Sequence, residues 1–345
     1  MKRILIIISI LTISILFINK SHCQTSQEAA EYMGKIIDPL SETKNETWQY
    51  IKAMAHSKGA KRVEKKRQKL LNEIREVRTE INRQHSFYKD DTLKKAIVEY
   101  LNLDYTILKE DYGKILDMEA IAEQSYDNME AYLLAKELAS EKLHESFDIV
   151  KKAEKDFAAK YNITLIESEE DRMSEKIRKA GEALKYYNTI YLIFFKSYKE
   201  DSYVMAALTN KDLNAFVQHN STLEKFSEEG IAELEKTKSF QGDIRMKRMG
   251  IEYLRFLNKE SKTTYVSQKD NFMKLDKFDK LDKAYKSKRK KDITNEDIKK
   301  FNEAVNEVNE AIKKSNELFN QNYEMKSKLL DKWNDTSDEF LREHS

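Results

Sequence analysis

One short segment of the chain has the spacing of a metal site. Glu141 and His144, in "EKLH", form a Glu-x-x-His pair, which carboxylate-bridged di-iron bundles carry on each of two helices. No other histidine supplies the second copy. The adjoining "HESFD" departs from His-Glu-x-x-His, because Asp148 stands where the second histidine should be. We therefore predict no metal site and expect His144 to lie on the surface.

Other catalytic motifs are missing from the sequence. No two glycines are closer than eight residues, which excludes a glycine-rich phosphate loop, and no Gly-x-Ser-x-Gly occurs. The chain has 60 Asp and Glu residues, so an acidic pair alone discriminates nothing. A carboxylate enzyme would need two or more acids buried together with shifted pKa values. We predict no catalytic residues, no cofactor and no enzymatic activity.

The aromatic segment "KYYNTIYLIFFKSY", residues 185–198, is the most plausible ligand contact. Its rings recur every three to four residues, so most of them share one side of a helix. Such a stripe is typical of a hydrophobic core. The alternative is a small-ligand pocket between helices, lined by Trp48, Tyr187, Tyr191 and Phe195.

Basic residues gather in two segments, and each has two interpretations. One segment contains Lys58, Lys61, Arg62, Lys65, Lys66, Arg67 and Lys69, and the other contains Lys283, Lys286, Lys288, Arg289, Lys290 and Lys291. A solvated helix face and a solvated loop are the simpler interpretation, and contacts to anionic envelope glycans or lipid headgroups are the alternative. The whole chain has 62 basic and 60 acidic residues, so the sequence predicts no nucleic-acid partner.

The N-terminal segment has the features of a signal peptide. Lys2 and Arg3 precede a 15-residue apolar run from residue 4 to residue 18, which is short for a membrane span. Cleavage after Cys23 would leave Gln24 as the new N-terminus, a signal peptide over 1–23 and a net charge of −1 in place of +2. The alternative is a lipid anchor on Cys23, although the residues before it fit a lipidation signal poorly. We expect an exported protein of the periplasm or cell surface with no transmembrane span in the mature chain.

The composition predicts an all-α fold. The chain has only 7 Gly and 1 Pro, 35% charged residues, and enough aromatic residues for a core. Linkers rich in Pro, Gly or Ser are absent, so we expect residues 24–345 to form a single domain, an elongated antiparallel helical bundle with long, coiled-coil-like helices.

Several helix boundaries follow from local patterns. Pro39 should end a first helix, and Ser41 is a plausible N-cap of the next. An apolar stripe predicts a helix from 60 to about 84, formed by Val63, Leu70, Ile74, Val77 and Ile81. The third helix should run to about residue 116, the fourth from 117 to about 161, and another without a break from 244 to about 285. Thr294 and Asp297 approximate a capping box before a last helix that reaches residue 343, roughly 70 Å long.

Two internal similarities suggest a repeat. Residues 99–112 align with 185–198, and "VEYLNL" at 98–103 is similar to "IEYLRF" at 251–256. A shared helical pattern among aromatic-rich helices explains such matches equally well.

Several segments together resemble a known family. They are "AAEYMGKIIDPL", "MEAIAEQSYDNMEAYLLAKELASEKL", "YNTIYLIFFKSYKEDSY" and "LLDKWNDTSDEFLREH". Together they resemble an uncharacterised family of bacterial surface proteins found in spirochaetes and in the Bacteroidetes group. The resemblance covers nearly the whole mature chain. It implies export and envelope placement, with an unknown protein or envelope component as partner, and it implies no reaction.

Overall fold

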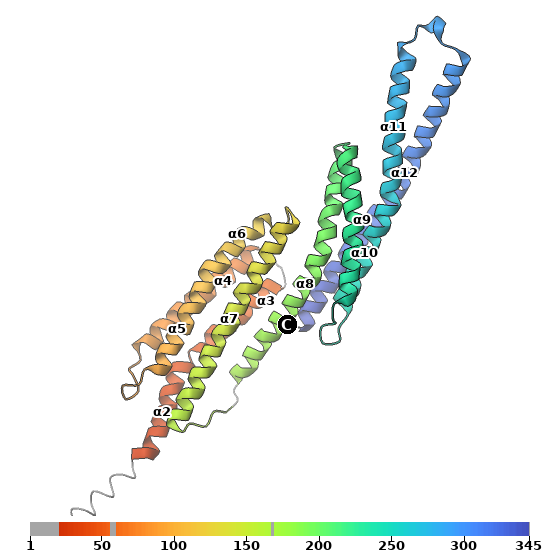
Figure 1. Ribbon diagram of the computed structural model, residues 1–345. Helices are drawn as coiled ribbons and strands as arrows, with labels where there is room; N and C mark the ends of the chain where they lie inside the picture. Colours follow the sequence, from red (N-terminus) through yellow and green to blue (C-terminus); the bar gives the residue numbers. More distant parts are fainter. Residues whose placement is uncertain (1–20, 56–59, 167–168, 345) are drawn as a thin grey trace, which may run out of the picture. The chain divides into compact units, whose positions relative to one another are not determined.

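The computed structural model describes residues 21–55, 60–166 and 169–344, which form helices joined by short turns (Figure 1). The prediction of an all-α helical bundle is confirmed. Among the described residues, only two isolated bridges, each within one turn, pair backbone segments as in a sheet. The described part of the chain contains no helix long and apolar enough to cross a membrane.

The chain divides into two compact units, where we expected one domain over 24–345. Unit 1 comprises Met1–Glu123, Asn128–Leu184 and His344–Ser345, and unit 2 comprises Gln124–Asp127 and Lys185–Glu343. Helix α8 (Glu169–Thr209) contributes to both units, so no flexible linker marks the division.

Unit 1 is built from α2 to α7 and the start of α8. Its elements are α2 (Ser21–Ile37), α3 (Leu40–Ala55), α4 (Ala60–Arg83), α5 (Thr92–Thr106), a π-helical turn η1 (Ile107–Asp111), α6 (Tyr112–Ala122) and α7 (Tyr126–Tyr161). The expected stripe of α4 is confirmed, since Leu70, Ile74 and Ile81 are fully buried. This stripe packs α4 between α3 and α5.

Unit 2 contains the rest of α8, four further helices and one 3-10 turn. They are α9 (Leu213–Lys236), α10 (Arg245–Lys262), α11 (Thr264–Ser287), a 3-10 turn η2 (Lys290–Asp292) and α12 (Asn295–His344). The predicted capping box of α12 is confirmed: Thr294 N donates to Asp297 Oδ2 at 3.0 Å, and Asp297 N donates to Thr294 Oγ1 at 3.2 Å.

Three predicted boundaries were wrong. Ser41 lies inside α3, where its hydroxyl donates to the carbonyl of Asp38 at 2.8 Å, so it does not cap the helix. The helix break expected near residue 116 occurs at 123–125, because residues 112–122 continue the apolar pattern in α6. The helix expected from 244 to 285 is interrupted at Thr263, where the backbone leaves the helical region (φ −121°, ψ −69°).

The same turn joins two helices in each unit. In unit 1 it pairs Phe87 with Asp90, and in unit 2 it pairs Phe240 with Asp243. Each turn follows a helix of 24 residues, α4 or α9. The two central residues of each turn have positive φ: Tyr88 (46°), Lys89 (68°), Gln241 (51°) and Gly242 (90°). This is the geometry of a tight turn between antiparallel chains.

A constant offset of 153 positions relates the helices on either side of these turns. The residues that match at this offset are buried in both units: Leu70 and Leu223, Ile81 and Leu234, Tyr100 and Tyr253, Leu101 and Leu254, and Tyr112 and Tyr265. The similarity between "VEYLNL" and "IEYLRF" falls at this offset. The two units therefore share a structural repeat.

The flanking helices extend the repeat. Tyr32 packs against Phe87 at 5.3 Å between ring centroids, and Tyr186 packs against Phe240 at 5.4 Å, so α2–α3 correspond to α8 at an offset of 154. Similarly Phe157 contacts Phe87 and Phe340 contacts Phe240, so α7 corresponds to α12 at an offset of 183. The similarity of 99–112 to 185–198 does not reflect this repeat, because those segments occupy different places in it; the alternative of a shared helical pattern accounts for the match.

The last hairpin of the repeat differs in length between the units. It is formed by α6 and α7 in unit 1, of 11 and 36 residues, and by α11 and α12 in unit 2, of 24 and 50 residues. The hairpin of unit 2 thus contains about four additional turns in each helix.

Candidate functional site

Unit 2 holds a buried cluster of charged side chains from four helices. Lys326 of α12 binds Asp201 Oδ2 of α8 and Glu260 Oε2 of α10, each at 2.7 Å. The hydroxyl of Tyr265, at the start of α11, donates to Asp201 Oδ1 at 2.6 Å. We call Asp201, Glu260, Tyr265 and Lys326 the buried ionic cluster.

The break between α10 and α11 positions this cluster. Because the backbone turns at Thr263, the last carbonyls of α10 lose their helical partners. Asn220 of α9 donates to the carbonyl of Ser261 at 3.1 Å, and Asn322 of α12 donates to the hydroxyl of Thr264. Side chains of neighbouring helices thus stabilise a break that carries Glu260 and Tyr265 on its two sides.

Burial determines the electrostatics of the cluster. Asp201 is 5% exposed and Glu260 is 3% exposed, so two carboxylates share one ammonium group away from water. Burial and the charge of Asp201 raise the pKa of Glu260 to about 7, although Lys326 opposes this shift. Burial alone would lower the pKa of Lys326, but the two carboxylates overcome it and raise that pKa.

The arrangement can therefore bind and release a proton near neutral pH. With Lys326 charged, protonation of Glu260 makes the cluster neutral, and its ionisation leaves one uncompensated negative charge in the interior. Burial and Asp201 also raise the pKa of Tyr265 well above its usual range, so its hydroxyl remains a donor. Within the described residues, no group of three or more His, Cys, Asp and Glu could hold a metal ion.

Unit 1 deforms the same part of the repeat in a different way. There η1 interrupts the helix, and Arg67 of α4 donates to the carbonyl of Leu108 at 2.8 Å. Arg67 and Leu108 are the counterparts of Asn220 and Ser261 at the offset of 153. Arg67 is only 8% exposed, so its assignment to a solvated basic face was wrong.

Unit 1 also buries an acid beside this deformation. Asp104 is 3% exposed and accepts a hydrogen bond from the hydroxyl of Ser146 at 2.6 Å. Burial raises the pKa of Asp104 to about 7, against the hydrogen bonds from Ser146 and Tyr100. No cation accompanies Asp104 in these contacts, which distinguishes it from the buried ionic cluster.

The aromatic residues considered as ligand contacts lie in different units. Trp48 is half-buried against the core of unit 1, and the other three lie on α8 in unit 2. Tyr191 stacks on Tyr187 at 5.8 Å and on Phe195 at 5.6 Å between centroids. Phe195 is 2% exposed. The rings of α8 thus pack against one another along the helix.

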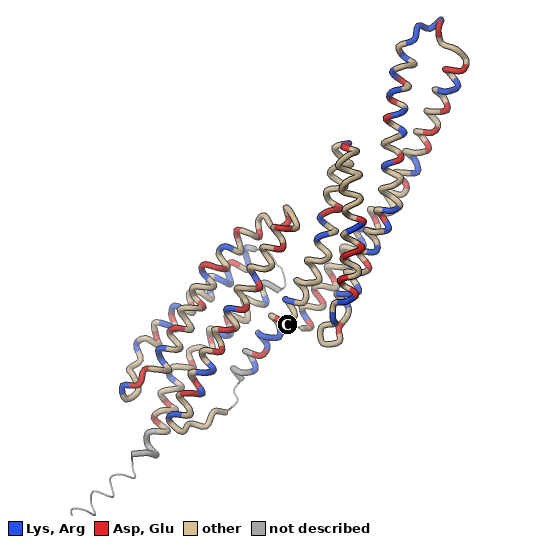
Figure 2. Tube along the Cα trace, in the orientation of Figure 1, with Lys and Arg blue, Asp and Glu red and all other residues tan. Residues whose placement is uncertain are grey.

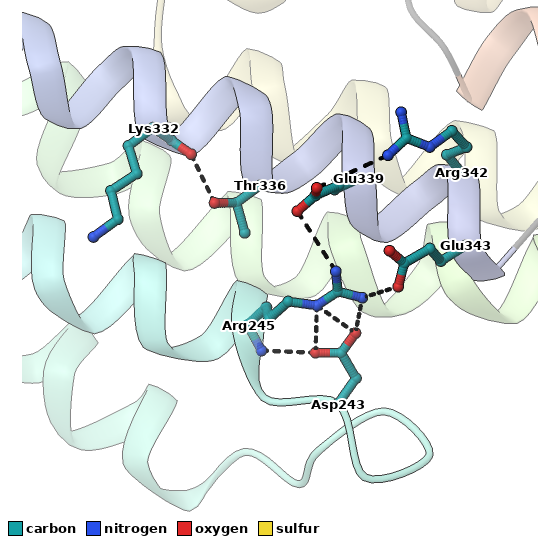
Figure 3. A network of polar contacts seen from close by, with 7 residues as sticks. All are labelled: Asp243, Arg245, Lys332, Thr336, Glu339, Arg342 and Glu343. Carbon is teal, nitrogen blue, oxygen red and sulfur yellow. Dashed lines mark hydrogen bonds and ion pairs between the residues drawn. The ribbon is translucent and has the colours of Figure 1, made fainter.

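The turn between α9 and α10 in unit 2 carries a second ionic network, which is more exposed than the buried ionic cluster (Figure 3). Arg245, at the start of α10, binds Asp243 at 2.6 Å and Glu343 at 2.5 Å, and its guanidinium lies 3.7 Å from Glu339. Arg342 reaches Glu339 from the same helix at 3.9 Å. These side chains, apart from Asp243, are at least one-third exposed, so the network contributes little to stability and fastens the turn to the end of α12.

The remaining predicted residues can also be placed. His144 is exposed on α7, as expected. Cys23 and Gln24 lie in the first turn of α2, and the apolar run before them lies outside the described residues. Lys58 of the first basic segment also lies outside them.

Sequence reasoning missed the buried ionic cluster and Asp104. A signal was present, because Glu260 follows Tyr253 and Leu257 at helical spacing, and Lys326 precedes Leu329 and Trp333 in the same way. A charged residue within an apolar stripe is the pattern that could have revealed the cluster.

Comparison with known proteins adds no relative. No protein-family model matches the chain, and neither a curated protein nor a solved structure matches it.

Proposed function

We propose that the protein is an exported, non-catalytic helical protein of the bacterial envelope that contacts its partner through the α11–α12 hairpin. The signal-like N-terminus and the resemblance to bacterial surface proteins support the location. The contrast between the two hairpins supports the interaction role.

The observation that carries the proposal is the lack of buried residues along the distal part of the hairpin. None of residues 269–307 is buried, although all of them are described. The buried residues of α11 end at Gln268, and those of α12 begin at Val308. We call residues 269–307 the distal arm; its α11 part alone spans roughly 28 Å of helix.

The distal arm contributes little to the core of unit 2. Its two helices contact each other through Phe278 and Phe301, at 5.6 Å between centroids, and through Tyr285 and Phe301, at 4.6 Å. A two-helix arm that buries so little apolar surface gains little folding free energy. Reaching a partner is the role that best accounts for its length.

Shortening the arm tests this role. Residues 276–307 are replaced by Glu-Gln, the first two residues of the turn between α6 and α7, so that Val308 takes the position of Ser125. Because the removed residues are not buried, we expect the melting temperature to change by only a few degrees. In fractionated source cells, the full chain should sediment with the envelope, and the shortened chain should shift to the soluble fraction. Equal distribution of two folded proteins would contradict the role of the arm.

The intact mass of the protein from those cells tests export. A mass that begins at Gln24 without an adduct supports cleavage after Cys23. A mass that begins at Cys23 with acyl chains would replace it by a lipid anchor. A mass that begins at Met1 would contradict export by a cleaved signal.

A further inference from the structure

The end of the distal arm carries a dense group of basic residues (Figure 2). Within ten positions there are six basic residues and one acid, Asp292. The six residues, which we call the basic tip, are Lys283, Lys286, Lys288, Arg289, Lys290 and Lys291. All six are exposed, and the side chains of Lys286 and Arg289 are each 73% exposed.

Acids of the arm neutralise only half of the basic tip. Lys286 pairs with Asp282, Lys288 pairs with Asp297, and Arg289 pairs with Asp292, at distances of 2.6 to 2.7 Å. The other three residues form no ion pair with the described chain: Lys283, Lys290 and Lys291. Three cations at the end of a hairpin thus remain available to an anionic partner.

The corresponding turn between α6 and α7 has the opposite charge. Between Lys114 and Lys136 the sequence contains no Lys or Arg and five acids: Asp117, Glu119, Glu123, Asp127 and Glu130. The repeat therefore does not require basic residues at the end of its hairpin. The positive charge is a property of the longer arm alone.

The arrangement of the basic tip favours an anionic surface over a linear polyanion, such as a nucleic acid, as its partner. Tyr285 and Phe301 stack on each other, so the rings nearest the tip are not available to stack on bases. Lys283 and Lys286 lie in the last turns of α11, and the other four cations lie on the short connection that follows. They form one compact group and not a long stripe that could follow a chain. A surface that is densely covered with anions can be bound by such a compact group of cations.

We propose that the basic tip binds anionic lipid headgroups and so holds the distal arm against a membrane surface. The proposal rests on the interaction role proposed above for the arm. Each Lys or Arg held near an anionic membrane strengthens binding roughly fivefold. Loss of the three unpaired lysines should therefore weaken binding on the order of a hundredfold.

Vesicle co-sedimentation of residues 24–345 tests the proposal. The vesicles are pure phosphatidylcholine, or phosphatidylcholine with 30% phosphatidylglycerol, at low and high salt. We expect binding only to the anionic vesicles, and loss of that binding at high salt, because salt screens exposed charges. Lys283→Gln, Lys290→Gln and Lys291→Gln together should reduce the affinity on the order of a hundredfold.

A matched variant removes the same charge elsewhere. Lys61→Gln, Arg62→Gln and Lys65→Gln replace three exposed basic residues of α4. This variant should retain most of the binding. Equal losses in both variants, binding to neutral vesicles, or no binding would each overturn the proposal. Tip-dependent binding to soluble polyphosphate without vesicle binding would also overturn it and assign the tip to a polyanion.

The vesicle assay and the fractionation of the shortened chain can fail independently, so the two proposals are tested separately. If the shortened arm releases the protein from the envelope but the vesicle assay fails, the arm has a partner other than lipid. If shortening has no effect on fractionation, the interaction role itself fails, whatever the vesicles show.

Discussion

The two units place apolar residues alike and polar residues differently. The buried ionic cluster of unit 2 corresponds to Thr47, Ile107, Tyr112 and Leu143 in unit 1, so only its tyrosine is shared. Conversely, Asp104 and Ser146 of unit 1 correspond to Leu257 and Leu329 in unit 2. Glu260, Lys326, Asp104 and Ser146 thus have apolar or aliphatic counterparts in the other copy, whereas Asp201 has a buried threonine. The fold requires the apolar positions, and the buried charges belong to each unit separately.

Removal of the cation from the buried ionic cluster should have the largest effect. Lys326→Met leaves Asp201 and Glu260 buried without compensation, and we expect the free energy of unfolding of unit 2 to fall by about 3–5 kcal/mol at pH 8. Denaturant unfolding can follow this in a Trp48→Phe background. Trp333, packed on Phe194 at 4.1 Å, then reports unit 2 alone.

The comparison itself supplies the control. Asp201→Thr, Glu260→Ile and Lys326→Leu together install the residues of unit 1. Because a buried ion pair is often replaced by apolar groups without loss, we expect this triple variant to recover most of the stability. A triple variant as unstable as Lys326→Met would show that the two units do not pack equivalently here.

The second prediction concerns pH. The pKa of Glu260 is about 7 in the folded chain and near 4.5 when unfolded, so the folded state binds more protons between these values. Its contribution to stability is therefore full below about pH 4.5 and is lost as the pH rises to about 7. Glu260→Gln cannot ionise, so its stability relative to the natural chain should rise between pH 5 and pH 8, on the order of 3 kcal/mol.

An exposed glutamate on the same helix is the control for this titration. Glu252 of α10 is 47% exposed and pairs with Lys332. Glu252→Gln should give a difference that stays nearly constant over the same pH range. A Glu260→Gln difference that is equally flat would mean that Glu260 ionises normally in the folded protein.

The sequence predicted the parts of this structure that depend on neighbouring residues. The stripe of α4 and the capping box of Thr294 and Asp297 follow from spacings of three and four, and both are present. The break at Thr263 was not predicted. It depends on Asn220 and Asn322, which lie on other helices and bond to the groups around it.

The repeat and the buried charges were harder to predict for related reasons. The two units share only short identical segments, because many matched positions conserve burial without conserving the residue. Thr43 and Ser197 are one such pair, both fully buried. Glu260 is one of 60 acids, and its place in the apolar stripe of Tyr253 and Leu257 is the one sequence signal identified above for its burial.

The third prediction tests how closely α9 and α10 approach. A Cβ on Gly250 would lie 2.7 Å from Leu234 Cδ1, whereas the counterpart of Gly250 in unit 1 is the buried Ile97. We expect Gly250→Val to overpack this contact and to lower the free energy of unfolding by about 1–3 kcal/mol.

Gly113→Ala is the control, because nothing lies within 4 Å of its added Cβ. That variant should be neutral or gain up to about 1 kcal/mol from helix propensity. Gly250→Val as stable as the natural chain would mean that the two helix pairs have similar spacing.

The smallest expected effect lies in the two turns. Lys89 of unit 1 has a φ of 68°, a conformation that disfavours residues with a Cβ, whereas Gly242 occupies the same position in unit 2 with a φ of 90°. Lys89→Gly should therefore stabilise unit 1 by about 0.5–1 kcal/mol, and Gly242→Lys should destabilise unit 2 by a similar amount. Hydrogen exchange at the amide of Asp90, which bonds the carbonyl of Phe87 at 2.7 Å, measures the first effect locally. Slower exchange in Lys89→Gly is the expected result. Faster exchange would show that the lysine side chain stabilises its turn by more than the strain of its backbone.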